Sequence, residues 1–271
     1  MPPQDRNTST VPLRGSTLQR FPSAAPTLPR STGRLPSVKI RYALALAFLS
    51  SISVVGLASQ RATLMARPPR GAIVLFNGKD SSHWKQRGSN DECKWDITDG
   101  CLVVKPGTGD ISTKRDFGDY KLHVEFWLPL MAKETSQGRA NSGVFNHGRY
   151  EIQVLDSYKN PTYKFGGVGA IYSQKDPDKD AIKPPEQWNT YDITFRAPRF
   201  DSSGKETEFP HITVFHNGIK IHDNVEIKVE STATGNTGPQ PPTGPIFLQD
   251  HGCPIRYRNI WIVPMNEGHK A

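Results

Sequence analysis

Cysteine is scarce in this sequence, and it does not occur at a spacing that would hold zinc. The chain has 271 residues and three cysteines, Cys93, Cys101 and Cys253. It contains no C-x-x-C pair and no cysteine–histidine cluster, which excludes a zinc module of the usual kind. In a two-residue hairpin at Asp99-Gly100, the sulfurs of Cys93 and Cys101 would lie far apart along the strands. We therefore expect buried free thiols.

Acidic residues are almost absent from the first 70 positions. This segment carries ten Lys or Arg and a single acid, Asp5, whereas residues 71–271 carry 24 basic and 25 acidic residues. The net charge of +8 therefore belongs to the N-terminal extension, and the rest of the chain has no overall field that would attract a phosphate backbone. We expect no nucleic-acid partner.

Long hydrophobic runs are also missing, apart from one near the N-terminus. Residues 1–38 are rich in Pro, Ser, Thr and Arg, which is typical of a disordered basic leader. Residues 39–60 combine basic residues, an apolar run over 42–58 and small residues at its end, a pattern that indicates a signal peptide or a membrane anchor. With residues 61–71 as a linker, we expect an exported protein that is periplasmic, at the cell surface or secreted.

Helical periodicity is absent from Gly71 onward, where short apolar runs alternate with turns of Gly, Pro, Asn and Asp. The clearest hairpin signal is Asn217-Gly218, which suits a type I′ turn. We predict a single all-β domain over 72–265, an antiparallel sandwich of two sheets. The predicted strands cover 72–76, 94–97, 101–105, 120–128, 142–147, 150–155, 168–172, 190–197, 211–216, 219–222, 245–250 and 256–263.

Polar side chains recur at alternate positions of several predicted strands. In residues 150–156, Glu151 and Gln153 share one face of the strand, and Asp156 follows at its end. Gln249 and His251 share a face in the same way. Three further candidates for this face lie at other strand positions and ends: Arg139, Asn141 and Arg258. Planar amide, carboxylate and guanidinium groups of this kind can bind adjacent sugar hydroxyls, so we expect one concave sugar-binding wall.

A series of ordered motifs covers residues 72–263. They are Leu75-Phe-Asn-Gly-Lys-Asp80, Phe117-Gly-Asp-Tyr120, Asn141-Ser-Gly-Val144, Tyr150-Glu-Ile-Gln-Val-Leu-Asp156, Gly169-Ala-Ile-Tyr172, Gly244-Pro-Ile-Phe-Leu-Gln-Asp-His-Gly252 and Arg258-Asn-Ile-Trp261. This order resembles the 3-keto-disaccharide hydrolase domain family, long labelled domain of unknown function 1080. The resemblance implies a concanavalin A-like sandwich (jelly roll) and cleavage of glycosidic bonds in sugars already oxidised to a ketone at C3, by lyase, hydratase or hydrolase steps.

A C3 ketone acidifies the proton on C2, so a base can remove it and expel the leaving group on C1. Such an enzyme needs a base, a group that stabilises the enolate and a proton donor. His251 suits the base, because imidazole ordinarily titrates near neutral pH, and Glu151 could serve if burial raises its pKa. Arg139 or Arg258 could stabilise the enolate. A divalent metal held by Glu151, Asp156 and His251 is the alternative.

Two other functions stay open. The same wall would serve a glycan-binding module without catalysis. Its expected substrate-binding residues are Arg139, Asn141, Gln153, Gln249 and Arg258. Glu151 and Asp156 also lie at a spacing similar to that of the carboxylates in retaining glucanases of sandwich fold. The expected partner in each case is a sugar or glycoside.

Overall fold

The computed structural model describes residues 64–265. The predicted basic leader (1–38), the predicted signal or anchor (39–60) and the first positions of the predicted linker lie outside the described residues. Within residues 64–265, no helix is long and apolar enough to cross a membrane.

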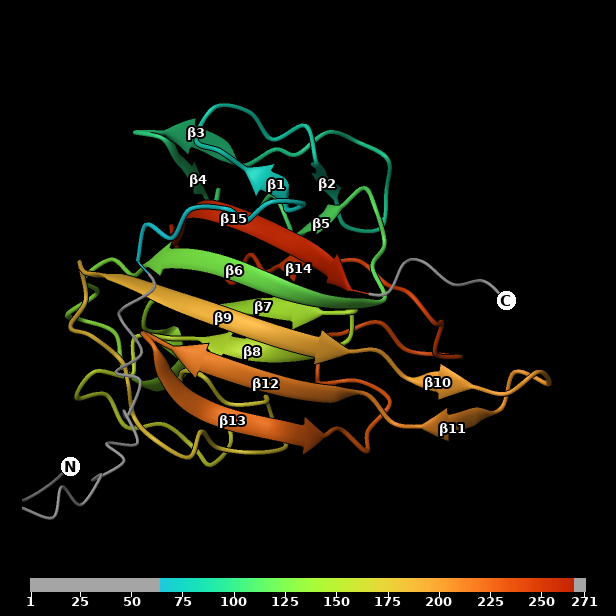
Figure 1. Ribbon diagram of the computed structural model, residues 1–271. Coiled ribbons are helices and arrows are strands. Elements are labelled where there is room, and N and C mark those ends of the chain that lie inside the picture. The colour runs from blue at the N-terminus through green and yellow to red at the C-terminus, as the bar shows by residue number, and fades with distance from the viewer. Residues whose placement is uncertain (1–63, 266–271) are drawn as a thin grey trace, which may run out of the picture. The chain divides into compact units, whose positions relative to one another are not determined.

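The described chain is an all-β sandwich whose strand pairs are antiparallel, as the sequence predicted. Figure 1 shows the larger sheet in front and the smaller one behind it. The larger sheet has eight strands: β13 (Ile219–Glu226), β12 (His211–His216), β9 (Trp188–Arg196), β6 (Asp119–Trp127), β15 (Arg256–Met265), β4 (Cys101–Val103), β3 (Asp96–Thr98) and, paired with β15, β1 (Ile73–Phe76). The smaller sheet has five: β2 (Trp84–Gln86), β5 (Ile111–Thr113), β14 (Phe247–Leu248), β7 (Ser142–Asn146) and β8 (Tyr150–Val154).

The core lies between the two sheets and is built by strict alternation. On β6, Leu122, Val124 and Phe126 are buried against the other sheet, and Val144 and Ile152 are buried from the opposite side. Burial of this apolar surface is the main favourable term that holds the sheets together. The same alternation turns the intervening side chains of β7 and β8 to the outer face of the smaller sheet.

Most predicted strands are confirmed, although β14 is much shorter than predicted. The predicted two-residue hairpin at Asn217-Gly218 is present, and so is the one considered at Asp99-Gly100. All four turn residues have positive φ, as a type I′ turn requires. The strand predicted at 168–172 is wrong: this stretch forms turns and isolated bridges, and Gly169 breaks the extended conformation with a φ of +77°.

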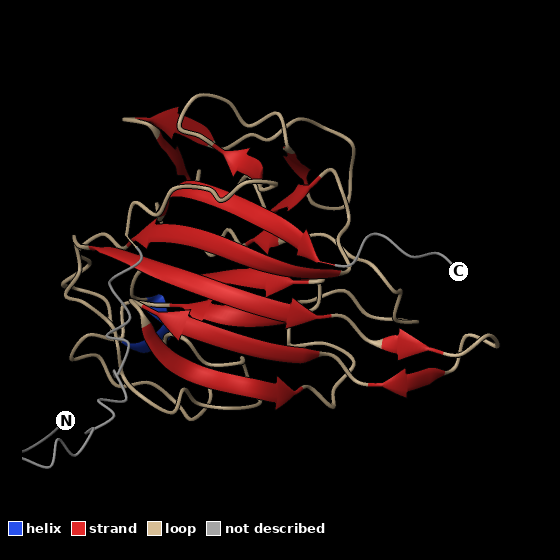
Figure 2. Ribbon diagram, viewed as in Figure 1, coloured by secondary structure: helices blue, strands red, loops and turns tan. Residues whose placement is uncertain are grey.

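Four short elements escaped prediction. They are β2, β5 and a two-stranded ribbon of β10 (Arg199–Phe200) and β11 (Glu206–Glu208). A single 3-10 turn, η1 (Ser136–Gly138), is the helical element in Figure 2. The three cysteines are free thiols, of which Cys101 and Cys253 are buried and Cys93 is half-buried.

Candidate functional site

A polar pocket of about 110 Å³ lies on the outer face of the five-stranded sheet. Strand β8 contributes Glu151 and Gln153, and the residues that flank β7 and β14 contribute Asn141 and Gln249. His251 also lines the pocket, so the two pairs that alternation placed on shared strand faces, Glu151 with Gln153 and Gln249 with His251, lie together. The remaining lining residues come from the loops over this face and from η1: Gln137, Tyr163, Tyr172, Ala233 and Thr234.

Glu151 is the acid in this pocket, and its surroundings favour the protonated form. Its side chain is 3 % exposed, and burial, with a smaller contribution from the negative charge of Asp110, raises its pKa to about 8. Among the described residues, its carboxyl has no hydrogen bond or ion pair. At neutral pH this group is therefore mainly a neutral carboxylic acid that can donate a hydrogen bond or a proton.

Room for the Glu151 carboxyl comes from a glycine on the neighbouring strand. Gly143 pairs with Gln153 on β8, and a Cβ atom at position 143 would lie 2.3 Å from Glu151 Oε1. No side chain fits there unless the carboxyl moves.

Three amide oxygens in the pocket lack partners. Asn141 Oδ1, Gln153 Oε1 and Gln249 Oε1 are buried without a hydrogen bond in the described part of the chain. Buried polar atoms normally have partners, so three such acceptors in one pocket indicate a place where donors of a ligand can bind.

His251 lies at the rim of the pocket on a turn that is fixed by the residue before it. Its side chain is exposed. The Asp250 carboxylate accepts hydrogen bonds from Gly109 N and Gly252 N, each at 2.9 Å, and Asp250 N donates to Asp110 Oδ1. The backbone around the imidazole is therefore held in place.

Two tyrosines form another wall of the pocket. The hydroxyls of Tyr163 and Tyr172 are hydrogen-bonded to each other, and burial raises the pKa of Tyr172. Both lie in the loop between β8 and β9, as does Gly166, whose missing side chain leaves space for the Tyr163 ring. Both hydroxyls can donate as well as accept hydrogen bonds.

Asp156 and Arg139 do not line the pocket. Asp156 is fully buried, and its Oδ2 accepts from Arg139 Nε at 2.7 Å. Its Oδ1 accepts from Tyr158 N. The carboxylate therefore stabilises the turn after β8, and the second carboxylate that a retaining glucanase needs is not among the described residues lining the pocket.

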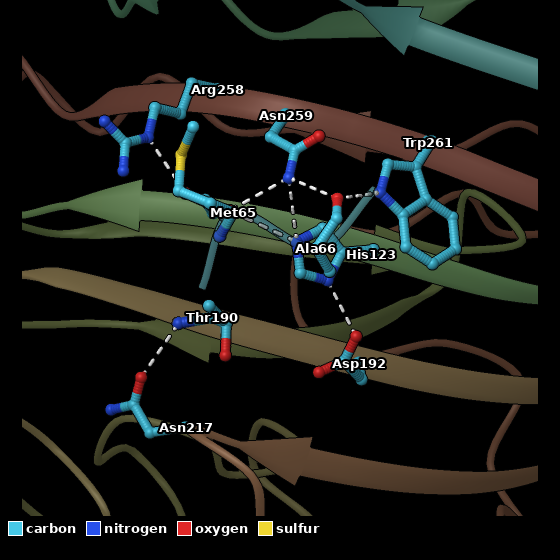
Figure 3. Close-up of polar contacts among 10 residues, drawn as sticks. Met65, Ala66, His123, Thr190, Asp192, Asn217, Arg258, Asn259 and Trp261 are labelled. Atoms are coloured by element: carbon cyan, nitrogen blue, oxygen red, sulfur yellow. Dashed lines mark hydrogen bonds and ion pairs between the residues drawn. The ribbon is translucent and has the colours of Figure 1, made fainter. Parts of the chain in front are cut away.

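Arg258 lies on the other sheet, in a polar cluster on the outer face of β6, β9 and β15 (Figure 3). Its guanidinium bonds Glu125 Oε2 at 2.8 Å and covers the Trp188 ring at 3.8 Å. It is therefore not near the pocket wall that carries Glu151.

The rest of this outer cluster surrounds a buried histidine. His123 Nδ1 is 2.7 Å from Asp192 Oδ1, and the ring stacks on Trp261. Interactions with Asp192 and Glu125 raise the pKa of His123 against the opposing effect of burial. Burial alone would raise the pKa of Glu125. Its hydrogen bonds with His123, Asn259, Arg258 and the Met65 amide outweigh burial and lower this pKa to about 2.

A backbone segment, residues 65–66, covers the cluster. Met65 N donates to Glu125 Oε1, and Ala66 O accepts from Asn259 Nδ2 at 2.9 Å. Asn259 also bonds Glu125 Oε1 at 2.9 Å. In Figure 3, dashed lines join the Asn259 amide to Ala66 and to the His123 ring. Both Glu125 oxygens are thus occupied, and the cluster attaches this segment to the sheet.

The three metal candidates do not form a ligand set. Asp156 is engaged with Arg139 outside the pocket, while Glu151 and His251 line it. No group of three or more His, Cys, Asp or Glu within residues 64–265 is placed to hold a metal ion. These residues do not fit a resident metal.

Sequence reasoning missed the loop residues that close the pocket. Gln137, Tyr163, Tyr172 and Thr234 lie outside regular strands, so alternation gave no signal for them. The sequence signals that were present are Gly143 and Gly166, each next to a pocket side chain.

Comparison with known proteins supports a carbohydrate-related role. A protein from Parabacteroides distasonis ATCC 8503, provisionally named a glycosyl hydrolase, has a solved structure similar to this one. It has 41 % identity over 73 % of this chain and 85 % of its own, with a TM-score of 0.68. A second structure from the same organism, with the same provisional name, has 22 % identity over 72 % of this chain and 94 % of its own, with a TM-score of 0.54, and supports the fold alone.

A search of curated proteins found no match. The family model of the 3-keto-alpha-glucoside-1,2-lyase-like domain matches residues 71–263, which contain the whole pocket. The chain belongs to the 3-keto-alpha-glucoside-1,2-lyase-like domain family.

Proposed function

We propose that this chain cleaves the C1–oxygen bond of glycosides whose sugar ring carries a ketone at C3. The observation that carries the proposal is the buried, unpaired Glu151 carboxyl, with a pKa of about 8, in a pocket that also contains His251. Family membership and the carbohydrate-related relatives support the same substrate class.

In the proposed reaction, the His251 imidazole removes the proton from C2. The electron pair of that bond forms the C1–C2 double bond through the enolate of the C3 ketone, and the C1–O bond breaks. The protonated Glu151 carboxyl gives its proton to the departing oxygen, which leaves as an alcohol. The product is a ring enone, and addition of water across its double bond would give the free 3-keto sugar.

The test measures turnover of methyl 3-keto-α-D-glucopyranoside and of the unoxidised methyl glucoside. We expect the oxidised sugar alone to react, with incorporation of solvent deuterium at C2 if proton removal is reversible. His251→Ala and Glu151→Gln should each lower kcat by about 100-fold or more, the usual range for loss of a general acid or base.

Matched controls are His83→Ala and Glu92→Gln, which replace an exposed histidine and an exposed glutamate outside the pocket and should leave turnover unchanged. In the wild type, kcat should fall above about pH 8 as Glu151 loses its proton. Full turnover in both pocket variants would overturn the mechanism. Tight binding of the oxidised sugar without turnover by the wild type would favour the glycan-binding alternative.

We further propose that the domain works outside the cytoplasm. The basic residues of 39–41, the apolar run 42–58 and the small residues after it support this location. Fractionation of cells that express the full chain should find it in an exported or membrane-attached fraction, and a purely cytoplasmic location would contradict the proposal.

A further inference from the structure

Three side-chain amides meet at one edge of the pocket, and the middle one belongs to Gln137. Its Nε2 donates to Gly166 O at 2.8 Å and to Thr162 Oγ1 at 2.7 Å. A backbone carbonyl only accepts hydrogen bonds. The NH₂ group of Gln137 must therefore face the loop that carries Gly166, and its Oε1 must face the other way.

The oxygen of Gln137 is turned toward the two neighbouring amides. It accepts from Asn141 Nδ2 at 3.1 Å and from Gln153 Nε2 at 3.0 Å. Asn141 Nδ2 also donates to the backbone oxygen of Gln137 at 2.9 Å. Since each of these acceptors requires an N–H donor, the orientation of both amides follows from the network itself.

The consequence is that both remaining carbonyl oxygens are free. Asn141 Oδ1 and Gln153 Oε1 are buried, lack partners among the described residues and belong to side chains that line the same pocket. Leaving a buried acceptor unpaired costs free energy, and a ligand that donates to it recovers that cost. Two such acceptors favour a ligand that carries hydrogen-bond donors such as hydroxyls.

We propose that Gln137 is a positioning residue, which holds the amides of Asn141 and Gln153 so that their oxygens accept hydrogen bonds from two hydroxyl groups of a bound sugar. The inference rests on the proposed function in that the ligand is a sugar, but it does not require that the sugar be cleaved. Gln137 acts through the other two amides and not on the reacting atoms.

The test compares two substitutions of nearly the same size. Gln137→Met removes every hydrogen bond of the side chain, so that Asn141 Nδ2 keeps only its bond to the backbone oxygen of Gln137 at 2.9 Å and Gln153 Nε2 only its longer bond to Gly166 O at 3.4 Å. The two amides are then held less firmly. Gln137→Glu keeps an oxygen toward both amides but cannot donate to Gly166 O. The control is Gln187→Met, which changes an exposed glutamine outside the pocket.

The probes are methyl 3-keto-α-D-glucopyranoside and its 2-, 4- and 6-deoxy analogues, with affinities measured calorimetrically in a His251→Ala background. We expect two of the three analogues to bind roughly tenfold more weakly than the parent sugar. Because two contacts of about tenfold each are weakened, Gln137→Met should weaken binding of the parent by up to roughly 100-fold and move both ratios toward one. Gln137→Glu should retain the ratios, even if it lowers Tm.

A purely structural role for Gln137 would weaken binding of the parent and the deoxy analogues equally, and that result would overturn the inference. So would retention of the ratios in Gln137→Met, or failure of every probe to bind. A parent sugar that binds with the expected ratios but is never turned over by the wild type would instead refute the proposed function and leave the acceptor pair standing.

Discussion

Glu151 and Gly143 work as one unit on adjacent strands. The glycine leaves the space that the carboxyl occupies, and the enclosure that results raises the pKa of the acid. The raised pKa of Glu151 therefore depends on both residues, because a glutamate on an open sheet face would be solvated and ionised.

The raised pKa of Glu151 predicts how stability depends on pH. Between its ordinary value of 4.5 and about 8, the folded protein retains a proton that the unfolded chain has released. The folded state therefore loses stability as pH rises through this window. Glu151→Gln should remove this loss, which we expect to be on the order of 5 kcal/mol.

The measurement is urea unfolding of the wild type and the variant at pH 5, 7 and 9. The two stabilities should be similar at pH 5, and the variant should be the more stable at pH 9. Glu92→Gln, at an exposed position, serves as the control. Parallel pH profiles for the wild type and Glu151→Gln would show that the carboxyl is ionised in the folded protein.

Alternation explains which site residues the sequence could predict. Glu151 and Gln153 differ by two positions within a regular strand, so their shared face followed directly. Asp156 lies beyond the end of β8, where the chain turns, and there the period of two no longer applies. Gln137 contributes through a network of amides from separate segments, which a pattern along one strand cannot reveal.

At the scale of strands, the two sheets use their outer faces differently. The smaller sheet carries unpaired polar atoms in a pocket, while the larger sheet carries a histidine–carboxylate cluster beneath residues 65–66. Periodicity predicted that Arg258 points away from the core, but it could not tell to which sheet β15 belongs. Strands as short as β2 and β5, with three residues each, carry too little pattern to be recognised.

A substitution in the outer cluster of the larger sheet should change stability without changing sugar binding in the pocket. Asn259 has a φ of +45°, so Asn259→Gly keeps the backbone conformation while it removes the bonds to Ala66 and Glu125. We expect faster hydrogen exchange at the Met65 amide and a loss of about 1–3 kcal/mol in stability, with unchanged binding of the sugar. Hydrogen exchange with peptide-level mass spectrometry checks this.

The comparison variant is Asn224→Gly, which also replaces a positive-φ asparagine but lies at an exposed position outside this cluster. A change in sugar affinity in Asn259→Gly alone would mean that the two faces are coupled through the core.

At the scale of the whole chain, the excess of positive charge and the residues that line the pocket lie in different segments of the sequence. The excess of basic residues lies in the first 70 positions, while residues 71–271 are nearly neutral, and none of the described residues that line the pocket is Lys or Arg. Composition alone located the excess of basic residues, since that required only a count. It did not predict a pocket lining without Lys or Arg, because Arg139 and Arg258 were expected on the sugar-binding wall.

The separation predicts that sugar binding is insensitive to salt. Raising NaCl from 50 to 500 mM should change the KM for the 3-keto glycoside by less than about twofold, because screening acts on charged partners and not on hydroxyl contacts. The check is a set of initial rates at constant pH. A steep dependence on salt would point to an acidic substrate.

Position 143 also gives a way to read the sequences of other members of this family. Any of them that carries a side chain larger than hydrogen at the place of Gly143 has no room for an acid in the Glu151 geometry. Such a member would have to place the carboxyl elsewhere, with a different enclosure and therefore a different pKa. One missing methyl group thus marks the members that can hold the acid as this chain does.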